Sequence, residues 1–518
     1  MHIHPQTPAR PARAVVHAAF TPRGFAMLDL TFEAPKPKVI AGAKHDWELV
    51  IGMEVHAQIA TKAKLFSGAS TQFGAEPNSN VAFVDAAMPG MLPVINEFCV
   101  EQAVRTGLGL KAEINLKSAF DRKNYFYPDL PKNYQITQQE QPICSEGFVP
   151  IRLEDGSIKN IRLIRIHIEE DAGKNIHSGS SNESFVDLNR AGTPLLEVVS
   201  YPDIANSYEA KAYLKALRAI VQYLHICTGN MEEGAFRADT NISVRKKGAI
   251  KLGTRVELKN INSFKYIGDA TDYEIERQIE ILENYGIVKQ ETRLWDDKNH
   301  KTIIMRSKEE AADYRFFQDP DLPLISIEDN EIEVVKKLLP ELPHAKFDRF
   351  IKDGLSAYEA DILVSDRDLA RYYEKTIEHS KSKHVVNWIL RDIMGYLKEH
   401  KTALFELKIT PEKLAAIINM LEDGTINGHA AKEIFDDVAQ NGSIPAEVVE
   451  QKGLQQIGSS DELEAIVKEI VEANPDSVAL YKSGKDRVFG FFVGQAMKKT
   501  QGKGNPKIIQ ELLKKHLL

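Results

Sequence analysis

The spacing of apolar residues changes once along this chain, and that change most constrains how it can fold. From about Trp47 to Leu324 the sequence is typical of strands and turns with a few helices. After about Ile332 the apolar residues recur at the three-to-four-residue spacing of helices that bury one face. Strands followed by helices predict an α+β protein.

Boundaries follow from helix signals and from proline-rich segments. Thr410 caps a predicted helix that has Pro411 at its first position, and Gly424 ends it. Proline-rich residues 320–343 and residues 408–410 are the expected domain boundaries. We therefore expect four parts, namely an extension (1–45), a strand-rich domain (46–335), a helical connector (336–408) and a helical tail (409–518).

The first 28 residues differ from the rest of the chain. They contain no Asp or Glu, but include Arg10, Arg13 and Arg23 among Ala and Pro. An organellar transit peptide is one interpretation. We favour a disordered extension, or a start assigned too far upstream, because prolines interrupt any amphipathic helix and Met27 offers a later start.

Composition excludes several classes of protein. No apolar run approaches the 18 or so residues of a membrane helix, so we expect no membrane contact. The three cysteines are too few for a disulfide framework and suit a reducing compartment, so we expect a cytoplasmic protein, with an organellar matrix as the lesser alternative.

The charge is unevenly distributed. The whole chain carries −8, whereas Pro475–Leu518 holds nine Lys or Arg against three acidic residues. Such asymmetry indicates contact with a phosphate backbone, although a solvated helical face would look the same. The candidate contacts are Lys485, Arg487, Lys498, Lys499 and Lys503.

Polar residues, most of them ionisable, occupy alternate positions of four predicted strands. They are Glu54, His56 and Gln58; Arg165, His167 and Glu169; Asp239, Asn241, Ser243 and Arg245; and Arg255, Glu257 and Lys259. A sheet face turned to water can alternate in the same way. Carboxylates, basic groups and imidazoles together are costly unless they bind something. If the strands are neighbours, they form one charged trough.

The chemistry of this trough favours a hard cation. Clustered carboxylates with one or two imidazoles suit Mg²⁺, whereas scattered cysteines argue against zinc. We expect His56 to be a ligand and His167 to be a core histidine bonded to the backbone. The sequence lacks GxxxxGK[ST], GxGxxG and GxSxG motifs. If ATP is used, a cation and basic side chains must therefore hold its phosphates.

One segment suggests contact with nucleotides. In residues 120–129, Arg122 and Lys123 precede Tyr125, Phe126 and Tyr127. Aromatic rings beside cations hold single-stranded nucleotides by stacking and phosphate contact. The alternative is a packed turn with exposed charges.

These stretches resemble the B subunits of the aspartyl/glutamyl-tRNA amidotransferases, from Trp47 to Leu518. The matching text is IGMEVHAQI, FGAEPNSNV, PGMLPVIN, FDRKNYFYPDLPKNYQITQ, IHIEEDAGK, DLNRAGTPLLEVVSYPD, MEEGAFRADTNIS, VELKNINSF, QETRLWD and DYRFFQDPDLP.

The resemblance implies a ligase subunit for protein biosynthesis. A cradle domain on a mainly antiparallel sheet would use ATP and Mg²⁺ to phosphorylate the amino acid on Glu-tRNA(Gln), Asp-tRNA(Asn) or both. A helical connector and a YqeY-like helical tail would follow. An amidase, the A subunit, would supply ammonia from glutamine, and a small C subunit would complete a heterotrimer.

Site residues carried over from the resemblance form four sets. They are the metal ligands Glu54, His56, Glu169, Glu170 and Glu197; the catalytic residues Glu169, Lys123 and Glu257; the cofactor-binding residues Lys123, Lys259 and Asp239; and the tail cations already named as tRNA contacts. Many members also carry four zinc-binding cysteines. Ser67, Ala69, Ala82 and Asp85 stand there in this chain, so no structural zinc is expected.

Two rival hypotheses remain open at this stage. The chain could be a tRNA-binding scaffold with a relict trough, and ATP consumption that depends on charged tRNA would exclude this. It could also be a self-sufficient metal-dependent phosphoesterase, which would act without any partner.

Overall fold

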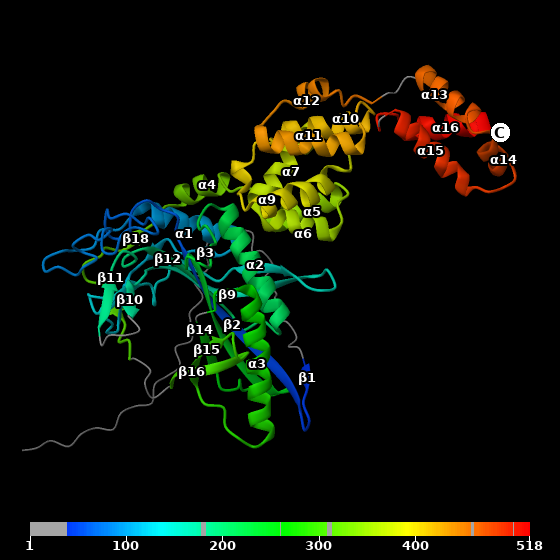
Figure 1. Cartoon of the computed structure of the whole chain (residues 1–518). Coiled ribbons are helices and arrows are strands. Elements are labelled where there is room, and N and C mark those ends of the chain that lie inside the picture. Colours follow the sequence, from blue (N-terminus) through cyan, green and yellow to red (C-terminus); the bar gives the residue numbers. More distant parts are fainter. Residues whose placement is uncertain are drawn as a thin grey trace, which may run out of the picture. The chain divides into compact units, whose positions relative to one another are not determined.

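A computed structural model describes residues 39–177, 183–259, 261–307, 313–456, 460–500 and 502–517. The α+β class is confirmed, because strands dominate the first part and the chain is helical from α4 onwards (Figure 1). The strands are β1 Val39–Ala41, β2 Asp46–Gln58, β3 Glu113–Ile114, β4 Lys117–Ser118, β5 Asp121–Asn124, β6 Tyr134–Thr137, β7 Cys144–Ser145, β8 Phe148–Arg152, β9 Ile158–Glu170, β10 Lys174–His177, β11 Ser184–Asp187, β12 Pro194–Ser200, β13 Phe236–Lys246, β14 Val256–Lys259, β15 Glu291–Asp296, β16 Lys301–Ser307, β17 Phe317–Gln318 and β18 Ile325–Ser326.

Helices α1 to α3 lie within the strand-rich part, and the others follow it. They are α1 Glu97–Gly109, α2 Ser207–Tyr223, α3 Phe264–Glu283, α4 Asp329–Lys337, α5 Pro343–Lys352, α6 Ala357–Ser365, α7 Arg367–His379, α8 Val385–Asn387, the π-helical turn η2 Trp388–Ile393, α9 Met394–His400, the 3₁₀ turn η3 Leu404–Glu406, α10 Pro411–Glu422, α11 Gly428–Asn441, α12 Pro445–Lys452, α13 Ser460–Glu472, α14 Pro475–Lys482, α15 Arg487–Lys499 and α16 Pro506–Leu517.

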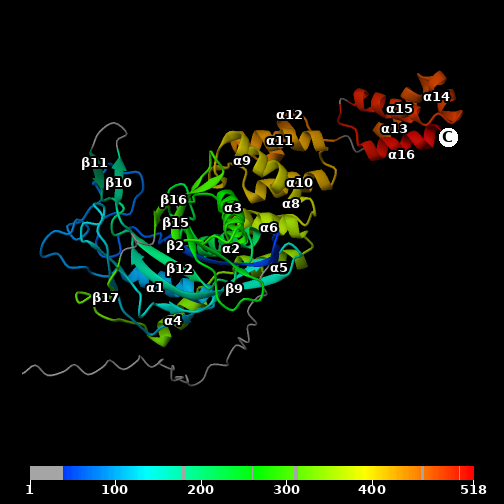
Figure 2. The same ribbon diagram turned by 90° about the horizontal axis from the view of Figure 1, so that it is seen from below.

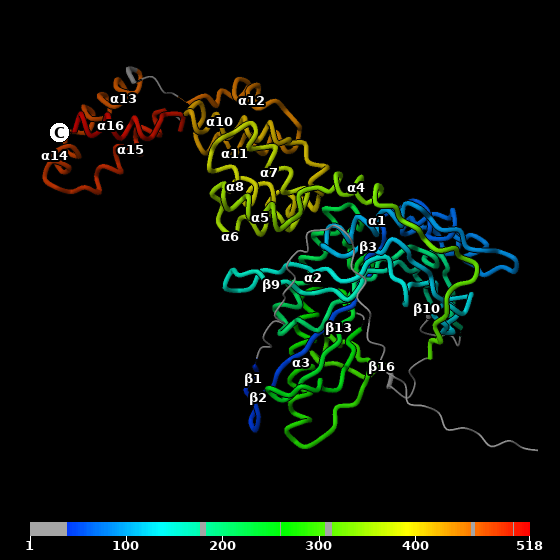
Figure 3. The backbone as a smooth tube through the Cα atoms, turned by 180° about the vertical axis from the view of Figure 1, so that it is seen from behind, coloured from blue at the N-terminus to red at the C-terminus, as the bar shows by residue number. Residues whose placement is uncertain are grey.

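An eleven-stranded sheet forms the centre of the first part. Its strand order is β16-β15-β14-β13-β2-β12-β9-β7-β3, with β1 on β2 and β8 on β9. The pairs are antiparallel except β14 with β15. Strands β2 and β13 run side by side over eleven paired positions, from Trp47 opposite Lys246 to Ala57 opposite Phe236 (Figure 3). This length of pairing sets the register of the polar residues.

The two faces of the sheet differ in chemistry. On β2, Leu49, Ile51, Met53 and Val55 are at most 2% exposed and share one apolar core with residues of α2 and α3. These two helices lie side by side against the sheet (Figures 1 and 2). Residues at the alternate positions of β2 point to the other face, because side chains alternate along a strand. The charged face of the predicted trough is therefore the face that α2 and α3 leave uncovered.

The helical part contains two cores, divided elsewhere than predicted. One core joins α5–α12, and the other joins α13, α15 and α16. The predicted boundary between residues 408 and 409 falls inside the first core, to which Ile409 and Leu414 belong. The Tyr372 hydroxyl also donates to the Ile409 carbonyl. The cores change beyond Leu454 instead. Helix α10 begins after the Thr410 cap, as predicted.

The folded part also begins earlier than expected. Residues 39–41, inside the predicted extension of 1–45, form β1 and pair with Asp46–Glu48 of β2. Ile40 contacts the apolar core, which accounts for the added strand. Residues 1–38 of the predicted extension lie outside the described residues. Across the described ranges, no helix combines the length and apolarity that crossing a membrane requires.

Candidate active site

Strand register brings the predicted site residues together. Glu197 of β12 lies directly opposite His56 of β2 on one side and His167 of β9 on the other. On the opposite edge of β2, Asp239 of β13 pairs with Glu54. Directly opposed side chains in an antiparallel sheet have Cβ atoms about 5 Å apart. The charged residues of five neighbouring strands (β9, β12, β2, β13 and β14) therefore form one surface, here called the trough.

The first acidic group in the trough consists of His56, Glu169 and Glu197. His56 Nε2 lies 3.3 Å from Glu169 Oε1 and 3.7 Å from Glu197 Oε2. One potential ligand atom from each of the three residues lies within 4.8 Å of the others. Glu169 is 2% exposed and also accepts a hydrogen bond from Thr137 Oγ1. The structure thus brings together three of the five predicted metal ligands.

His167 lies beside this group instead of in an apolar setting. Its Nε2 is 3.0 Å from Glu197 Oε2, and it is 2% exposed. We expected a core histidine bonded to the backbone. The histidine is buried, but its partners are carboxylates, because His167 and Glu169 point to the same face of β9. Its Nδ1 is buried and has no hydrogen-bond partner among the described residues.

The electrostatics of the first group favour charged side chains. Burial would lower the pKa of His56, but the charges of Glu197 and Glu169 outweigh it and raise the pKa to about 9. Burial acts in the opposite direction on a carboxylate and would raise the pKa of Glu197, but the charges of His167 and His56 lower it to about 2. The pKa of Glu169 also lies well below its ordinary value, against the effect of burial, because the His167 and His56 imidazoles lie 3.8 and 3.3 Å from its oxygens and Lys123 adds positive charge. Both carboxylates are therefore ionised at neutral pH.

A second acidic group consists of Glu54, Asp239 and Glu257. Their carboxylate oxygens also lie within 4.8 Å of one another. Lys259 Nζ is 2.6 Å from Asp239 Oδ2 and 3.1 Å from Glu257 Oε1, and Asn241 donates to Glu54. Burial and the charge of Glu197 raise the pKa of Glu54. We predicted Glu54 as a ligand together with His56, but the structure places it with Asp239 and Glu257.

Glu170 belongs to neither group. Adjacent residues of a strand point to opposite faces, so Glu170 faces away from Glu169. Its Oε1 accepts hydrogen bonds from the Ile136 amide and from Lys132, with which it forms an ion pair. The prediction of Glu170 as a ligand is corrected for this reason.

A pocket of about 810 Å³ opens beside both acidic groups. His56, Asp239 and Lys259 line it together with three cations: Lys174, Arg190 and Arg237. Sequence analysis did not single out Arg190 or Arg237. Arg237 could have been found, since it continues the alternation of Asp239 two positions earlier on β13. Arg190 lies in a turn without any periodic signal.

Asp171 orients these two arginines. Its Oδ2 lies 2.9 Å from Arg237 and 3.6 Å from Arg190. Arg190 also donates to the carbonyls of Ala172 and Gly173. The pocket therefore presents positive charge close to the two acidic groups. This arrangement suits an anion that is bound together with a cation.

Lys123 approaches the first acidic group from another sheet. It lies on β5, which pairs with β6, and its partner across the pair is Gln135. The Gln135 side chain donates to the Glu170 carbonyl, so β5 and β6 are held against the end of β9. The Lys123 charge contributes to the lowered pKa of Glu169.

One of the four positions where the resemblance implies cysteines, Asp85, belongs to a buried ion pair, and the other three contact that pair. Lys64 is 0% exposed, and its Nζ lies 3.1 Å from Asp85 Oδ2. The Ser67 hydroxyl and the Ala82 amide donate to the same oxygen. Gly192 is required beside this pair, because its φ is +80° and an added Cβ would lie 2.7 Å from Asp85 Oδ1.

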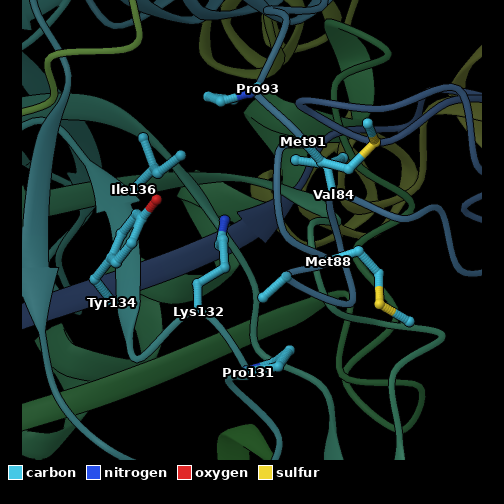
Figure 4. A pocket seen from close by; sticks show the side chains of 9 residues that line it. Val84, Met88, Met91, Pro93, Pro131, Lys132, Tyr134 and Ile136 are labelled. Carbon is cyan, nitrogen blue, oxygen red and sulfur yellow. The ribbon is translucent and has the colours of Figure 1, made fainter.

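A smaller pocket of about 260 Å³ lies elsewhere, and most of the residues that line it are of apolar types. Figure 4 shows Lys132 standing between Tyr134 and the loop that carries Met88 and Met91. No carboxylate is among the described residues that line it. Because no carboxylate or histidine that could hold a cation is among these described residues, we assign the chemistry to the pocket beside the acidic groups.

The predicted tRNA-binding cations lie in or near α15. Lys485, Arg487, Lys498 and Lys499 are exposed, whereas Lys503 is half-buried. Arg487 begins the helix and Lys498 lies near its end, so about 17 Å of helix separates them. Lys499 forms an ion pair with Glu469 of α13. These cations are spread along a surface, which suits a phosphate backbone better than a single anion.

The ligand chemistry of the trough fits Mg²⁺. Five carboxylates and one imidazole make up the two acidic groups, and Mg²⁺ prefers oxygen ligands. When ionised, the three carboxylates of the second group carry three negative charges, and Lys259 neutralises one of them. Two negative charges remain. A divalent cation would balance this excess.

Comparison with known proteins covers almost the whole chain. The GatB/GatE catalytic domain matches residues 49–333, and the GatB domain that includes the YqeY region matches residues 371–517. The B subunit of the aspartyl/glutamyl-tRNA(Asn/Gln) amidotransferase from Ruegeria pomeroyi is 53% identical over 502 residues, which is 95% of this chain and 100% of the relative. The proteins of the same name from Roseobacter denitrificans and Jannaschia sp. are 52% and 51% identical over the same shares of each chain.

Proposed function

This chain belongs to the family of aspartyl/glutamyl-tRNA(Asn/Gln) amidotransferase B subunits, and on that premise we propose that it activates the amino acid of a misacylated tRNA. The substrates are Glu-tRNA(Gln), Asp-tRNA(Asn) or both. The chain uses ATP to phosphorylate the side-chain carboxylate, which ammonia then converts to the amide. The chain is thus a ligase subunit that forms a carbon–nitrogen bond.

The reaction balances in two steps. A carboxylate oxygen of the amino acid attacks the γ-phosphorus of ATP, the bond to the β-phosphate oxygen breaks, and ADP leaves. Ammonia then attacks the acyl phosphate, inorganic phosphate leaves, and the nitrogen loses a proton. Activation is necessary because the free carboxylate is delocalised and would have to expel oxide.

The trough supplies what phosphoryl transfer requires, which is positioning and charge neutralisation. Mg²⁺ held by His56, Glu169 and Glu197, or by Glu54, Asp239 and Glu257, would neutralise phosphate oxygens. Lys259, Arg237 and Arg190 bind the remaining phosphate charge from the pocket wall. Lys123 draws the carboxylate of the amino acid toward Glu169.

The convergence of the two acidic groups carries this proposal. Residues from five strands, up to 203 positions apart, place three ligand atoms within 4.8 Å twice over, next to a cationic pocket of about 810 Å³. An ordinary wet sheet face does not bury carboxylates to the 2% exposure of Glu169.

The proposal extends to partners and location. An amidase, the A subunit, supplies ammonia from glutamine, and the cytoplasmic heterotrimer is completed by a small C subunit. The tail cations bind the body of the tRNA. Support for a separate amidase comes from the cysteines: Cys99, Cys144 and Cys227 are all buried, and burial raises the pKa of each thiol, so none suits an amide-cleaving nucleophile.

The experiment that tests this function is an assay of the co-purified heterotrimer with misacylated tRNA, glutamine, ATP and Mg²⁺. We expect ATP consumption that requires the misacylated tRNA, together with formation of amidated aminoacyl-tRNA. Binding of tRNA without ATP consumption would show a scaffold instead. Hydrolysis of phosphate esters by the chain alone would show a phosphoesterase.

A further prediction concerns the tail. Replacing Lys485, Arg487, Lys498, Lys499 and Lys503 by Gln should raise the Kd for tRNA about tenfold and flatten its salt dependence. Each lost phosphate contact should lower the slope of log K against log salt by about 0.9. Filter binding between 50 and 200 mM salt would measure both.

The control variant carries the same type of substitution, a cation replaced by Gln, outside the tail. Lys336 and Lys337 are exposed on α4 and can be replaced by Gln in the same way. A truncation after Gln456 provides a second variant, and it leaves the core of α5–α12 whole. If the variant with all five substitutions kept the same affinity for tRNA and the same salt dependence, a role of these cations in tRNA binding would be contradicted.

A further inference from the structure

Five aromatic side chains from two segments far apart in the chain lie near one another. Tyr125 and Tyr127 follow β5, whereas Tyr314, Phe316 and Phe317 lie at and before β17. These five residues are called the aromatic platform. The backbone holds the segments together: the Asn124 amide donates to the Tyr314 carbonyl at 2.9 Å, and Phe317 pairs with Arg122 across β17 and β5.

Four rings of the platform form a continuous series. Tyr127 contacts Tyr125, Tyr125 contacts Tyr314, and Tyr314 contacts Phe316, with centroids 6.0, 6.1 and 5.9 Å apart. Each contact is edge-to-face, at interplanar angles of 65° to 77°. This geometry fixes the rings without stacking them on one another, so their faces are not covered by a parallel neighbour in the series.

The platform is a surface and not a core. Tyr127 is 54% exposed, Phe316 37% and Phe317 48%, and none of the five residues belongs to an apolar core cluster. The sequence left open a packed turn as the alternative for residues 120–129. Exposure of this extent favours a ligand-binding surface, since large aromatic patches in water are costly unless they bind something.

Cations are interleaved with the rings. Lys123 Nζ lies 4.9 Å from the centroid of Tyr314, and the Arg122 guanidinium lies 5.8 Å from that of Phe317. Arg315, between Tyr314 and Phe316 in sequence, is exposed. Alternating cations and aromatic faces suit a ligand that alternates phosphates and planar bases. A protein partner would not require this alternation.

One member of the platform, Tyr125, is linked to the strand that carries Glu169. The Tyr125 hydroxyl donates to Gln135 Oε1 at 3.4 Å, and Gln135 Nε2 donates to the Glu170 carbonyl, next to Glu169. The amino acid of a charged tRNA is attached to the terminal ribose. If its carboxylate reaches Glu169, the adjoining nucleotides must lie just outside the first acidic group, where the platform is.

We propose that the aromatic platform binds the unpaired 3′-terminal nucleotides of the aminoacyl-tRNA by base stacking, with Lys123 and Arg315 facing the phosphates. This inference rests on the proposed function and adds its nucleotide-binding subsite. Stacking accepts every base, because each has a planar face. The platform thereby places the aminoacyl end in the trough without reading the rest of the tRNA.

The test replaces Tyr127 and Phe316 by Leu, singly and together, because Leu keeps apolar volume and removes the planar face. In the purified heterotrimer, each change should raise KM for misacylated tRNA about tenfold, as expected for loss of one stacked base. KM for ATP should change less than about twofold. The matched controls are Tyr358→Leu and Phe405→Leu, which are 74% and 87% exposed in the helical part.

A second measurement is independent of catalysis. A short single-stranded RNA with 2-aminopurine as its 3′-terminal base should lose fluorescence on binding the unaltered heterotrimer, because stacking quenches this base. The double variant should bind it without that quenching. Loss of ATP affinity with unchanged tRNA KM would overturn the inference in favour of the adenine of ATP.

The outcomes separate the two levels of the argument. If the unaltered heterotrimer consumes no ATP with misacylated tRNA, the proposed function fails, and the fluorescence of the RNA still decides about stacking. If it is active but the platform variants match the controls in both measurements, the platform does not bind the tRNA end and the inference fails alone.

Discussion

Replacing Glu169 by Gln or Ala should abolish ATP-dependent phosphorylation, with a loss of about 10³-fold or more in kcat, while glutamine hydrolysis by the partner subunit is at least partly retained. Glu169 is the most deeply buried carboxylate of the first acidic group, and it contacts His56 and Thr137. Removing its charge removes a ligand where phosphate charge must be neutralised, and losses of this size are typical of such sites.

Two assays on the same preparation measure this division of labour. ADP release in the presence of misacylated tRNA reports phosphorylation, and glutamate release from glutamine reports the partner. Glu140→Gln is the matched control, because Glu140 is an exposed carboxylate outside the trough. An equal loss of both activities in Glu169→Gln would count against separate catalytic subunits.

The second large effect is on stability. Replacing Lys64 by Met should lower the free energy of unfolding of the surrounding region by about 3 kcal/mol or more. Lys64 is fully buried, and Met fills most of its volume but leaves Asp85 as a buried carboxylate without its cation. Ser67 and the Ala82 amide still donate to Asp85, but neither carries a charge.

Hydrogen exchange at the amides of Lys64 and Leu65 measures this effect locally. These amides donate to the Ala69 and Gly192 carbonyls, so they exchange when the loop opens. The exposed pair of Lys247 and Asp46 is the control, and Lys247→Met should cost less than about 1 kcal/mol.

A double variant distinguishes lost pairing from lost packing. Asp85→Asn keeps an oxygen that can accept from Ser67 and Ala82 while removing the unpaired charge. Adding it to Lys64→Met should therefore recover part of the stability. If the double variant loses the sum of the two single losses, the ion pair does not account for the burial of Lys64.

The loop that this ion pair holds also affects the trough. Lys64 Nζ donates to the Leu188 carbonyl, and the Leu65 amide donates to the Gly192 carbonyl. Residues 188–192 include Arg190, which lines the larger pocket. The ion pair therefore connects the surface loop to a cationic wall of the candidate site.

Much of the site was predictable because alternation along a strand is a local property. Glu54 and His56 must share a face of β2, and His167 and Glu169 a face of β9, whatever the rest of the chain does. A carboxylate-rich polar face opposite an apolar one was therefore readable from the sequence. The α+β class followed in the same way, from a change of period that needs no knowledge of contacts.

Pairing between distant segments was not predictable from the same signals. Only the register of β12 between β2 and β9 decides that Glu197 meets both His56 and His167. The pairing of β13 with β2 assigns Glu54 to Asp239 and Glu257 and not to Glu169. One step along β9 turns Glu170 away toward Lys132. Sequence spacing specifies a face, but it does not specify the neighbour.

The sequence by itself determined the fold class, the apolar and polar faces of each long strand and the chemical character of the trough, since these depend on residues near one another in the chain. The tertiary structure decided which carboxylates form each group, that Arg190 and Arg237 join them, that Tyr314 meets Tyr125, and that one helical core continues past residue 409. All of these depend on contacts between residues distant in sequence, and such contacts are set by the packing of the whole fold, which leaves no periodic pattern in the sequence.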